Sequence, residues 1–399
     1  MKLGVPLWTV LKSREEFGGP DLPLLTVKSD SGVSMRDLAE GRQPSDDLAG
    51  YRRVMAGDLV VNKLWARFGA YGVAGIDGVI SPAYWVLMVD RGRVAPGYLH
   101  HLLRSSLYLA EIARVSKDMP PNGFDLPWSQ FRQIVVDLPP LDEQRRIADF
   151  LDTETARLDA VQLLRDEQLA LLAGREAAAL TEALDDPAVR RIRLGYLAKL
   201  QSGVTVGGSR PSDGLVERPY LRVANVKEDR LELDSVTTIR VTPEEARASR
   251  LRPGDVLMTE GGDLDKLGRG TVWRGEISGC LHQNHVFALR CDARLLPEYL
   301  SYFTRTAPAR AYFAATGVKT TNLASTNSEK VRNLPVPLPS LATQRERVEQ
   351  IERALRRSGN LRTFLDHQAS LVAERRQALI TAAVTGQLDV TTARGIDTR

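Results

Sequence analysis

The chain contains 399 residues, of which 43% are hydrophobic and 26% are charged, and its formal net charge is +4. This composition is ordinary for a soluble globular protein of two or three domains, and so small a net charge does not by itself indicate a nucleic-acid partner. No run of eighteen apolar residues occurs, which excludes a transmembrane helix, and the N-terminal apolar stretch is too short for a signal peptide. The only two cysteines, Cys280 and Cys291, argue against a disulfide framework and for a cytoplasmic location.

Residues 1–137 are expected to form an α/β module built mainly from short strands and turns. Its segments are apolar runs bounded by turn residues, which is typical of short strands. Strands are predicted at Leu22–Val27, after the turn within Ala56–Trp65, at Ala83–Asp90 and at Ile134–Pro140, and a helix is predicted at Ala95–Ile112.

A long helix is predicted from Leu141 to Leu184. Pro139 and Pro140 end the preceding strand and suit a helix start. Backbone N–H groups in the first turn of a helix have no carbonyl partner within the helix, so a proline, which has no N–H, is tolerated there. No proline follows until Pro187, and apolar residues recur at spacings of three and four. Such a helix would be about 65 Å long, too long to bury its apolar stripe within a small module. Two such helices can bury their stripes against each other as a coiled coil.

The chain contains that second helix, because the segment repeats. LPPLDEQRRIADFLD at 138–152 returns as LPSLATQRERVEQIE at 338–352, and matches at a constant offset of 200 continue to Thr181 and Thr381. The sequence therefore predicts an antiparallel pair of helices. The residues expected in the pairing are Ile147, Leu151, Leu158, Val161, Ile351, Leu355, Leu365 and Val372.

The two repeated segments carry opposite charge. Residues 136–186 hold 5 Lys and Arg against 13 Asp and Glu, a net of −8, whereas residues 336–399 hold 10 against 7, a net of +3. Opposite charges favour pairing between the two copies over pairing of either copy with itself. The alternative interpretation is that both segments are solvated helix faces that differ in composition and do not pair through their charges.

Residues 188–337 follow the plan of residues 1–137. Gly57-Asp58 is repeated as Gly254-Asp255, and Pro96–Leu99 is repeated as Pro297–Leu300, but the offsets vary, so the copies differ by insertions. The modules could therefore recognise different ligands, or they could have drifted apart after a duplication. The predicted boundaries are 1–137 for the first module, 138–187 for the first spacer helix, 188–337 for the second module, 338–390 for the second helix and 391–399 for a flexible tail.

Polar, glycine-marked loops at matching places in the two modules are the candidates for DNA contact. The second module has a net charge of +6 over residues 191–335, against +2 over residues 1–135. Lys and Arg in such loops can hold phosphates, and Arg, Lys or Asn can read base edges, although a solvated surface charge is the alternative for each residue. The candidates are Lys63, Arg67, Tyr71 and Lys117 in the first module and Lys266, Arg269, Lys319, Thr320 and Asn322 in the second.

No catalytic, cofactor or metal site is predicted. Met119–Phe124 superficially resembles the Asn-Pro-Pro-aromatic loop of amino-methyltransferases, but the order is wrong and no glycine-rich cofactor loop precedes it. Gly317–Thr320 lacks the adjacent Gly-Lys of a phosphate-binding loop. Cys280, His282 and His285 are zinc-ligand types, but on one continuous strand they would point to opposite faces, so half-buried strand residues are expected instead.

On the doubled strand-to-helix motif, the helix-end motif ERRQALITAAVTGQL at 374–388 and the repeated frames GDLVV and GDVLM, the chain resembles the specificity subunit of type I restriction–modification systems. The resemblance covers essentially the whole chain. It implies two α/β target-recognition domains in a pseudo-two-fold arrangement, separated by an antiparallel coiled coil of two long helices. It also implies a non-catalytic subunit without cofactors, because methylation and cleavage belong to separate subunits. The first helix end departs from the motif, since Gly174 and Ala177 stand where the second copy has Glu374 and Gln377.

The partners implied are double-stranded DNA, two methyltransferase subunits and, in the full complex, restriction subunits, with no membrane. Two half-sites would be read about one turn of DNA apart, roughly 34 Å, as in other two-fold readers. The alternative is a free-standing coiled-coil scaffold that binds DNA or another partner without a methyltransferase. A fused methyltransferase is opposed by the missing cofactor loop.

Overall fold

The computed structural model describes two compact units. One comprises Met1–Arg165 with Asp366–Arg399, and the other comprises Asp166–Leu365. Each unit contains one α/β module together with one half of each long helix. The residues that the structure describes are 3–19, 21–37, 48, 50–119, 123–207, 210–211, 213–227, 229–262, 267–319 and 324–390, so the predicted tail at 391–399 lies outside them.

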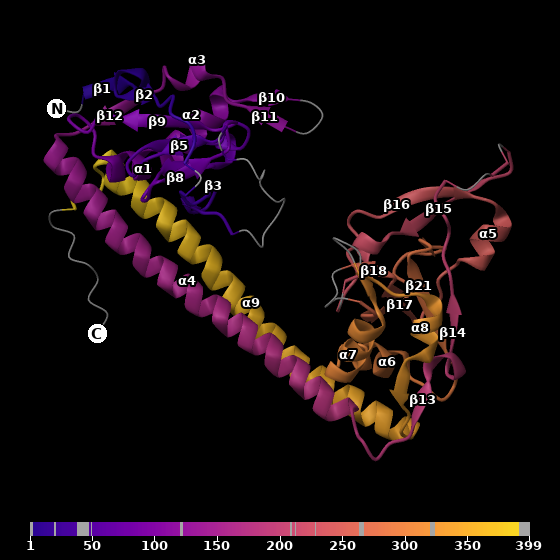
Figure 1. The fold of residues 1–399 in the computed structure, drawn as a ribbon. Coiled ribbons are helices and arrows are strands. Elements are labelled where there is room, and N and C mark those ends of the chain that lie inside the picture. The colour runs from indigo at the N-terminus through magenta and orange to yellow at the C-terminus, as the bar shows by residue number, and fades with distance from the viewer. Residues whose placement is uncertain are drawn as a thin grey trace. The chain divides into compact units, whose positions relative to one another are not determined.

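Two long helices are present where the repeat predicted them. Helix α4 spans Leu141–Leu184, as expected, and α9 spans Leu341–Thr385, within the segment 338–390 that was predicted to contain it. Asp142 and Glu143 lie in the first turn of α4, where negative charge stabilises the positive end of the helix dipole. Within each unit the two helix halves lie side by side and run in opposite directions (Figure 1).

The module of the first unit is organised around a four-stranded antiparallel sheet in the order β2-β9-β6-β7. Strand β1 pairs with β12, which leads into α4. The strands are β1 (Leu3–Pro6), β2 (Leu11–Ser13), β3 (Leu25–Lys28), β4 (Gly32–Met35), β5 (Arg52–Val54), β6 (Leu59–Val61), β7 (Tyr71–Val73), β8 (Gly78–Ile80), β9 (Trp85–Val89), β10 (Lys117–Met119), β11 (Gly123–Asp125) and β12 (Val135–Leu138).

The single helix predicted at Ala95–Ile112 was wrong, because two helices occupy this region. Helix α1 spans Pro96–Arg104 and α2 spans Ser106–Val115, and a short α3 spans Trp128–Phe131. Ser105 separates α1 from α2 with an extended backbone, and its hydroxyl donates to the carbonyl oxygen of Leu102 at 2.7 Å. Serine side chains compete in this way for the carbonyls of the preceding turn, which the apolar spacing alone did not reveal.

The second module repeats this frame. Its central sheet has the order β14-β21-β17-β19, and β13 pairs with β24, which precedes α9. The strands are β13 (Arg191–Arg193), β14 (Ala198–Gln201), β15 (Val216–Leu221), β16 (Thr237–Val241), β17 (Asp255–Thr259), β18 (Gly261–Gly262), β19 (Gly270–Val272), β20 (Leu281–His282), β21 (Val286–Cys291), β22 (Val318–Lys319), β23 (Ala324–Ser325) and β24 (Pro335–Pro337), and the helices are α5 (Pro243–Ala248), α6 (Pro297–Phe303), α7 (Ala307–Thr316) and α8 (Ser328–Asn333).

Both central sheets are buried on two faces, which explains their continuous apolar strands. In β6, Leu59 and Val61 join the core that α1 and the long helices cover, whereas Val60 joins a separate core on the other face. In β17, Leu257 likewise faces away from the core that contains Val256 and Met258. Successive side chains of a strand point to opposite faces, so a short apolar run can fill two cores at once.

One glutamine anchors the start of each long helix to its module. The Gln144 amide accepts a hydrogen bond from the Ala95 N–H at 2.9 Å and donates to the carbonyl oxygens of Arg93 and Pro139. Gln344 accepts from the Leu296 N–H at 2.9 Å and donates to the carbonyls of Arg294 and Pro339. Both side chains are buried, so these bonds fix the direction in which each helix leaves its module.

The far end of each long helix contacts the module that precedes the other helix. Thr381 of α9 accepts a hydrogen bond from the Ser106 N–H at the start of α2, at 3.1 Å. Its repeat equivalent, Thr181 of α4, accepts from the Ala307 N–H at the start of α7, at 3.0 Å. Each module core is therefore built from the start of one long helix and the end of the other.

The side chains between the paired helix halves recur at alternating spacings of three and four. Such spacing is the heptad pattern of a coiled coil. The at least partly buried positions are Leu151, Thr155, Leu158, Gln162, Arg165, Ala369, Val372 and Arg376 in the first unit and Leu169, Leu172, Glu176, Leu180, Ile351, Leu355, Ser358 and Leu365 in the second.

The predicted pairing residues are at least partly buried, with one exception. Ile147 and Leu151 are buried against the first module as well as the partner helix half, and Leu365 is 4% exposed. Val161 is 51% exposed, so its prediction as a pairing residue was wrong. The seam passes through Leu158 and Gln162, one residue beyond Val161, because the heptad places polar as well as apolar side chains between the helices.

Candidate nucleic-acid interface

The first candidate loop of the first module lies between β6 and β7. The side chains of Lys63 and Arg67 are both partly exposed there. Lys63 lies 3.9 Å from the carboxylate of Asp125, and Arg67 donates to Asp118 at 3.1 Å. Both acids belong to the β10–β11 hairpin. These ion pairs hold the loop against the hairpin and leave both cations at the surface.

Aromatic side chains accompany these cations. Trp65 is 56% exposed and Phe68 is 47% exposed, and the two rings contact each other with centroids 5.7 Å apart. Phe68 also meets Phe124 of the hairpin edge to face, and the Arg67 guanidinium lies 4.6 Å from the centre of that ring. The sequence prediction considered only the polar residues of this loop, and the exposed aromatic rings were missed.

Tyr71 does not belong to this surface. Its side chain is 1% exposed, and its hydroxyl donates to the carbonyl oxygen of Leu103 at 2.8 Å. Burial raises the pKa of the Tyr71 hydroxyl. The prediction of Tyr71 as a DNA-contacting residue is therefore corrected: the strand β7 begins at this position, which turns the ring into the core.

The second pair of candidate loops forms two small hairpins at equivalent places. Lys117 is exposed on β10 of the first unit, and Lys319 lies on β22 of the second. In the second unit, β23 joins both β22 and β18 to make a three-stranded sheet. Lys266, Thr320 and Asn322 lie outside the described residues.

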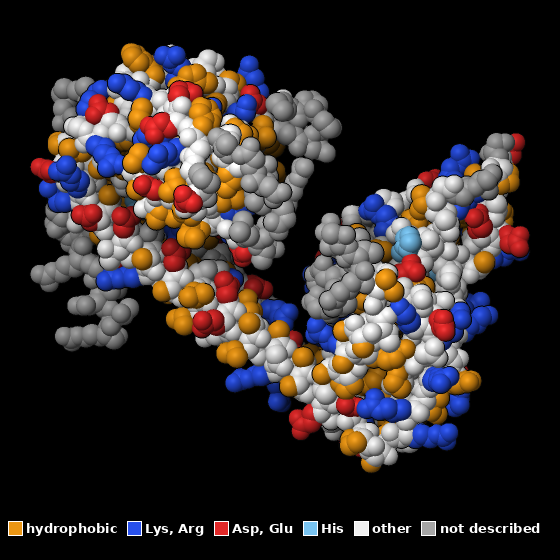
Figure 2. Space-filling model, viewed as in Figure 1, with side chains coloured by type: hydrophobic (Ala, Val, Ile, Leu, Met, Phe, Trp, Pro, Cys, Tyr) orange, Lys and Arg blue, Asp and Glu red, His pale blue; other side chains and the backbone are white. Residues whose placement is uncertain are grey.

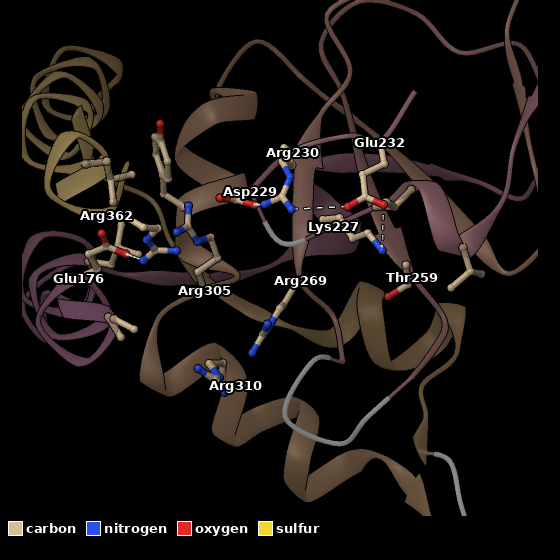
Figure 3. Close-up of a pocket in the computed structure, with 18 of the residues that line it drawn as sticks. Glu176, Lys227, Asp229, Arg230, Glu232, Thr259, Arg269, Arg305, Arg310 and Arg362 are labelled. Atoms are coloured by element: carbon tan, nitrogen blue, oxygen red, sulfur yellow. Dashed lines mark hydrogen bonds and ion pairs between the residues drawn. The ribbon is translucent and has the colours of Figure 1, made fainter. Parts of the chain in front are cut away.

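Arg269 lines a pocket of the second unit that has a volume of about 1160 Å³. Figure 3 shows arginine side chains reaching this cavity from different elements. Arg310 comes from α7, Arg305 from the turn before α7, and Arg362 from α9. The pocket floor includes small residues of α4, and its far wall is the segment that follows η4 (Val223–Asn225).

Acidic residues in the pocket wall pair with some of these cations. Glu176 of α4 accepts from Arg362 at 3.1 Å, which also joins the two helix halves. Across the cavity, Glu232 lies 3.3 Å from the Lys227 ammonium and 3.5 Å from Arg230, which also contacts Asp229 (Figure 3). The described lining holds six cationic side chains and three carboxylates, so its formal charge is positive: Lys227, Arg230, Arg269, Arg305, Arg310 and Arg362 against Glu176, Asp229 and Glu232.

In the first unit, the positions equivalent to Glu176 and Ala177 carry the longer side chains of Arg376 and Gln377, which contact neighbouring groups. There Gln377 donates to the carbonyl oxygen of Arg104 at 3.1 Å. Arg376 donates to the carbonyl of Thr155 at 3.2 Å and contacts Asp159. The repeat equivalents in the second unit are Ala177 for Gln377, Glu176 for Arg376 and Gly359 for Asp159. Ala177 and Gly359 are small, and both line the cavity together with Glu176.

Large apolar side chains are exposed on both long helices outside the seams, and hydrophobic side chains are visible on their surface in Figure 2. Several occupy equivalent positions of the repeat, offset by 200 residues. The exposed residues are Val161, Leu163, Leu164 and Leu171 on α4 and Leu361, Phe364 and Leu371 on α9.

Cys280 and His282 are buried in the second module, whereas His285 is exposed and pairs with the Glu260 carboxylate at 2.5 Å. The continuous strand considered for this segment is interrupted, because β20 ends at His282 and β21 begins at Val286. His282 is buried and pairs with the Val286 carbonyl at 2.6 Å, and burial lowers its pKa. Burial raises the pKa of both cysteine thiols to about 12. Among the described residues, no group of three or more metal-ligating side chains comes together.

None of the helices described by the structure is both long enough and apolar enough to cross a membrane.

The fold and the surfaces described above define a class of protein in which two similar α/β modules are each tied to a pair of antiparallel helix segments. No protein-family model matches the chain. It is 24% identical to the type I restriction enzyme EcoKI specificity subunit of Escherichia coli K12 over 313 residues, which cover 73% of this chain and 65% of that protein. It is also 24% identical to the StySPI specificity subunit of Salmonella potsdam over 320 residues, covering 74% and 66%.

A solved structure supports the same relationship at the level of the fold. A chain from a study of complex assembly and conformational transition in a type I restriction–modification system matches 97% of this chain with a TM-score of 0.68, at 20% identity and with 98% of its own length covered. The predicted resemblance is confirmed: the chain is a relative of the type I specificity subunits. The aligned region spans about two thirds of the length of the two curated relatives.

Proposed function

We propose that this chain is the sequence-specific DNA-recognition subunit of a type I restriction–modification complex, with one module for each half of an asymmetric bipartite target. The observation that carries this proposal is that the two units share one arrangement of strands and helices, whereas the loops on their surfaces differ in sequence. The sheet order and the Gln144 and Gln344 anchors are the same in both units. A duplicated frame with different loops is expected of a protein that positions two readers of different sequences.

The loops supply the residue types that DNA contact requires. In the first module, Lys63, Arg67 and Lys117 are exposed beside the rings of Trp65 and Phe68. Lysine and arginine bind phosphates and guanine edges, and apolar side chains contact thymine methyl groups or enter deformable base steps. In the second module the equivalent region carries arginines and no such aromatic cluster among its described residues. We assign the predicted candidates that remain, including Arg269 and Lys319, to this recognition surface.

We propose that methyltransferase subunits bind the outer faces of the helix pair. Val161 and Leu361, Leu164 and Phe364, and Leu171 and Leu371 are exposed at equivalent repeat positions. Exposed apolar side chains in such numbers mark an interaction surface. Because the surface occurs in both repeats, two copies of the partner are expected, and restriction subunits would join through them. In this assignment the chain itself is non-catalytic, requires no cofactor and acts in the cytoplasm.

Co-expression with a methyltransferase subunit encoded beside this chain, followed by mapping of adenine methylation, tests the proposal. The expected result is methylation at one bipartite motif whose two halves differ. Exchanging residues 1–137 for the first module of a related protein should change one half of that motif and leave the other half unchanged. A change in both halves, or methylation without sequence preference, would contradict the modular assignment.

The alternative of a free-standing scaffold predicts a different outcome. The chain would then be stable and monodisperse alone, and co-expression would produce no methylation. The exposed leucines and phenylalanine on the helices favour the partnered assignment, because a protein that works alone rarely keeps large apolar patches in water.

A further inference from the structure

We propose that Trp65 and Phe68, in the loop between β6 and β7, insert their rings into one base step of duplex DNA, within the half of the target that the first module reads. The inference rests on the proposed function, because it takes duplex DNA as the ligand of the first module. It goes further in assigning the two rings to a base step that they unstack.

The two rings are exposed to an extent that indicates a binding partner. Trp65 is 56% exposed, Phe68 is 47% exposed and the neighbouring Leu64 is 38% exposed, so three large apolar side chains of one short turn lie in water. An aromatic side chain removes roughly 150–250 Å² from solvent when it is covered, and exposed apolar surface of this kind marks a contact site.

The turn that carries the rings is fixed to the module. Ala66, between the two aromatic residues, is fully buried in the core of the first unit. The Trp65 N–H donates to the carbonyl of Asn62 at 3.0 Å, and the Phe68 N–H donates to the carbonyl of Trp65 at 3.0 Å. Gly69 ends the turn with a φ of 87°, a conformation that favours glycine. Because the backbone beneath the rings is already ordered, little conformational entropy is lost when the rings enter a base stack.

Cationic side chains surround the rings. Lys63 and Arg67 belong to the same loop, and Lys117 lies on the neighbouring β10–β11 hairpin. With the two hairpin carboxylates, Asp118 and Asp125, these groups keep an excess of one positive charge. The Lys63 ammonium lies 3.9 Å from Asp125, which is too far for a hydrogen bond, so it can turn toward a phosphate. Exposed rings bordered by cations suit a ligand with stacked flat faces inside and phosphates outside, which is the chemistry of a nucleic acid.

The relative orientation of the rings favours insertion over contact with a groove surface. The planes of Trp65 and Phe68 are tilted by 44°, with centroids 5.7 Å apart. Apolar side chains that enter a base step kink the duplex by about 20–90°, so the two base faces of the opened step lie at an angle to each other. Each ring can then lie against one of these faces. Phe124 packs edge to face against Phe68, with centroids 5.3 Å apart, and supports that ring from the hairpin side.

The fluorescence of 2-aminopurine, an adenine analogue that is quenched by stacking, tests the insertion. The full-length chain is purified with its co-expressed methyltransferase subunit and bound to duplexes that contain the mapped target. The analogue is placed at successive positions of the first module's half, leaving out the methylated adenine, whose own extrusion would also raise the signal. We expect fluorescence to rise at one step. Trp65→Ala/Phe68→Ala should abolish this rise and weaken DNA binding at least about 10-fold, because stacking on an aromatic ring contributes roughly 10- to 100-fold per base.

A matched control removes a tryptophan and a phenylalanine from other segments of the same module. Trp8 is 48% exposed and Phe17 is 52% exposed, and each ring lies beside an arginine, as the rings of the loop do. Trp8→Ala/Phe17→Ala should keep the fluorescence rise and bind DNA within about 2-fold of the unaltered protein. Equal losses in the two double variants would overturn the proposal, and so would a rise that persists in Trp65→Ala/Phe68→Ala.

A conservative variant separates stacking from a structural role. Trp65→Tyr/Phe68→Tyr keeps two flat rings and should keep the fluorescence rise, and its loss at unchanged thermal stability would contradict insertion. If Trp65→Ala/Phe68→Ala no longer co-purifies with the methyltransferase subunit, the rings bind a protein and the assignment to DNA is wrong. The methylation map of the unaltered protein is obtained first. A chain that yields no bipartite motif fails the proposed function, whereas a motif without a fluorescence rise contradicts the insertion alone.

Discussion

The two units agree most closely where a helix begins and differ most where a helix ends. At the starts of α4 and α9, Gln144 and Gln344 make the same three hydrogen bonds to equivalent backbone groups. At the ends, Gln377 bonds to the module of the first unit, whereas Ala177 lines a cavity in the second. The buried anchor fixes the helix direction in both units, while the helix end can vary because less backbone depends on it.

A second comparison shows which part of a buried ion pair the frame requires. Asp58 and Asp255 occupy the same place in the repeated Gly-Asp turn, and both are buried. Asp58 is paired with Arg14, which follows β2, whereas Asp255 is paired with Arg290 on β21. Each carboxylate also accepts a backbone N–H three residues earlier, from Met55 or Arg252. The Gly-Asp turn therefore requires the aspartate in both modules, whereas the arginine that pairs with it comes from a different segment in each module.

The largest predicted effect is the loss of one of these acids. Asp58→Ala should lower the free energy of unfolding by about 4 kcal/mol, and Asp255→Ala by about 3 kcal/mol, because each leaves an arginine without its carboxylate. The first loss should be larger, since the side chain of Arg14 is 11% exposed and that of Arg290 is 32% exposed and better solvated. Urea unfolding of the full-length variants measures both values.

The control for these variants is an exposed ion pair from each unit. Asp118 pairs with Arg67 in the first unit, and Asp292 pairs with Arg294 in the second. Replacing either acid by alanine should change the unfolding free energy by no more than about 0.5 kcal/mol, because surface ion pairs contribute little. A larger loss for Asp255→Ala than for Asp58→Ala would refute the explanation based on solvent exposure.

The next prediction tests whether the two anchors are equivalent. Gln144→Ala and Gln344→Ala should each cost about 2–3 kcal/mol, because buried N–H and carbonyl groups lose their partner. Gln168→Ala and Gln368→Ala provide the control, since both side chains are exposed on the same two helices. Unequal losses, differing by more than about 1 kcal/mol between the two anchors, would show that the helix starts are held differently despite their identical hydrogen bonds.

Much of this frame could be predicted from the sequence because it repeats. The constant offset of 200 located both long helices, and the Gly-Asp and Pro-x-Tyr-Leu matches located the equivalent strands and helices. The break at Ser105 was not predictable from apolar spacing, because the side chain's bond to the Leu102 carbonyl depends on tertiary packing. Val161 was misplaced because a helical stripe of apolar residues does not distinguish the seam from an exposed apolar face.

The site was less predictable than the frame. The loop positions of Lys63, Arg67 and Arg269 followed from polarity and glycine content, but Tyr71 lies in the core since a strand begins at that residue. The pocket is lined by residues from α4, α7, α9 and the segment after η4. Because these segments are far apart in the sequence, no short sequence motif predicts the pocket. The one available signal was the replacement of Gln377 by Ala177 in an otherwise matching repeat.

The smallest predicted effect exchanges that pair of residues. Gln377→Ala should lower the unfolding free energy by about 1 kcal/mol, because it removes a partly buried hydrogen bond to the Arg104 carbonyl. Ala177→Gln should have an effect of no more than about 0.5 kcal/mol in either direction, since Ala177 lines a cavity and the longer side chain can extend into it without displacing a hydrogen-bonded group. Gln350→Ala, on an exposed face of α9, is the control. A loss in Ala177→Gln as large as in Gln377→Ala would mean that the second unit cannot accept the first unit's packing, and that the helix ends differ in backbone position as well as in side chain.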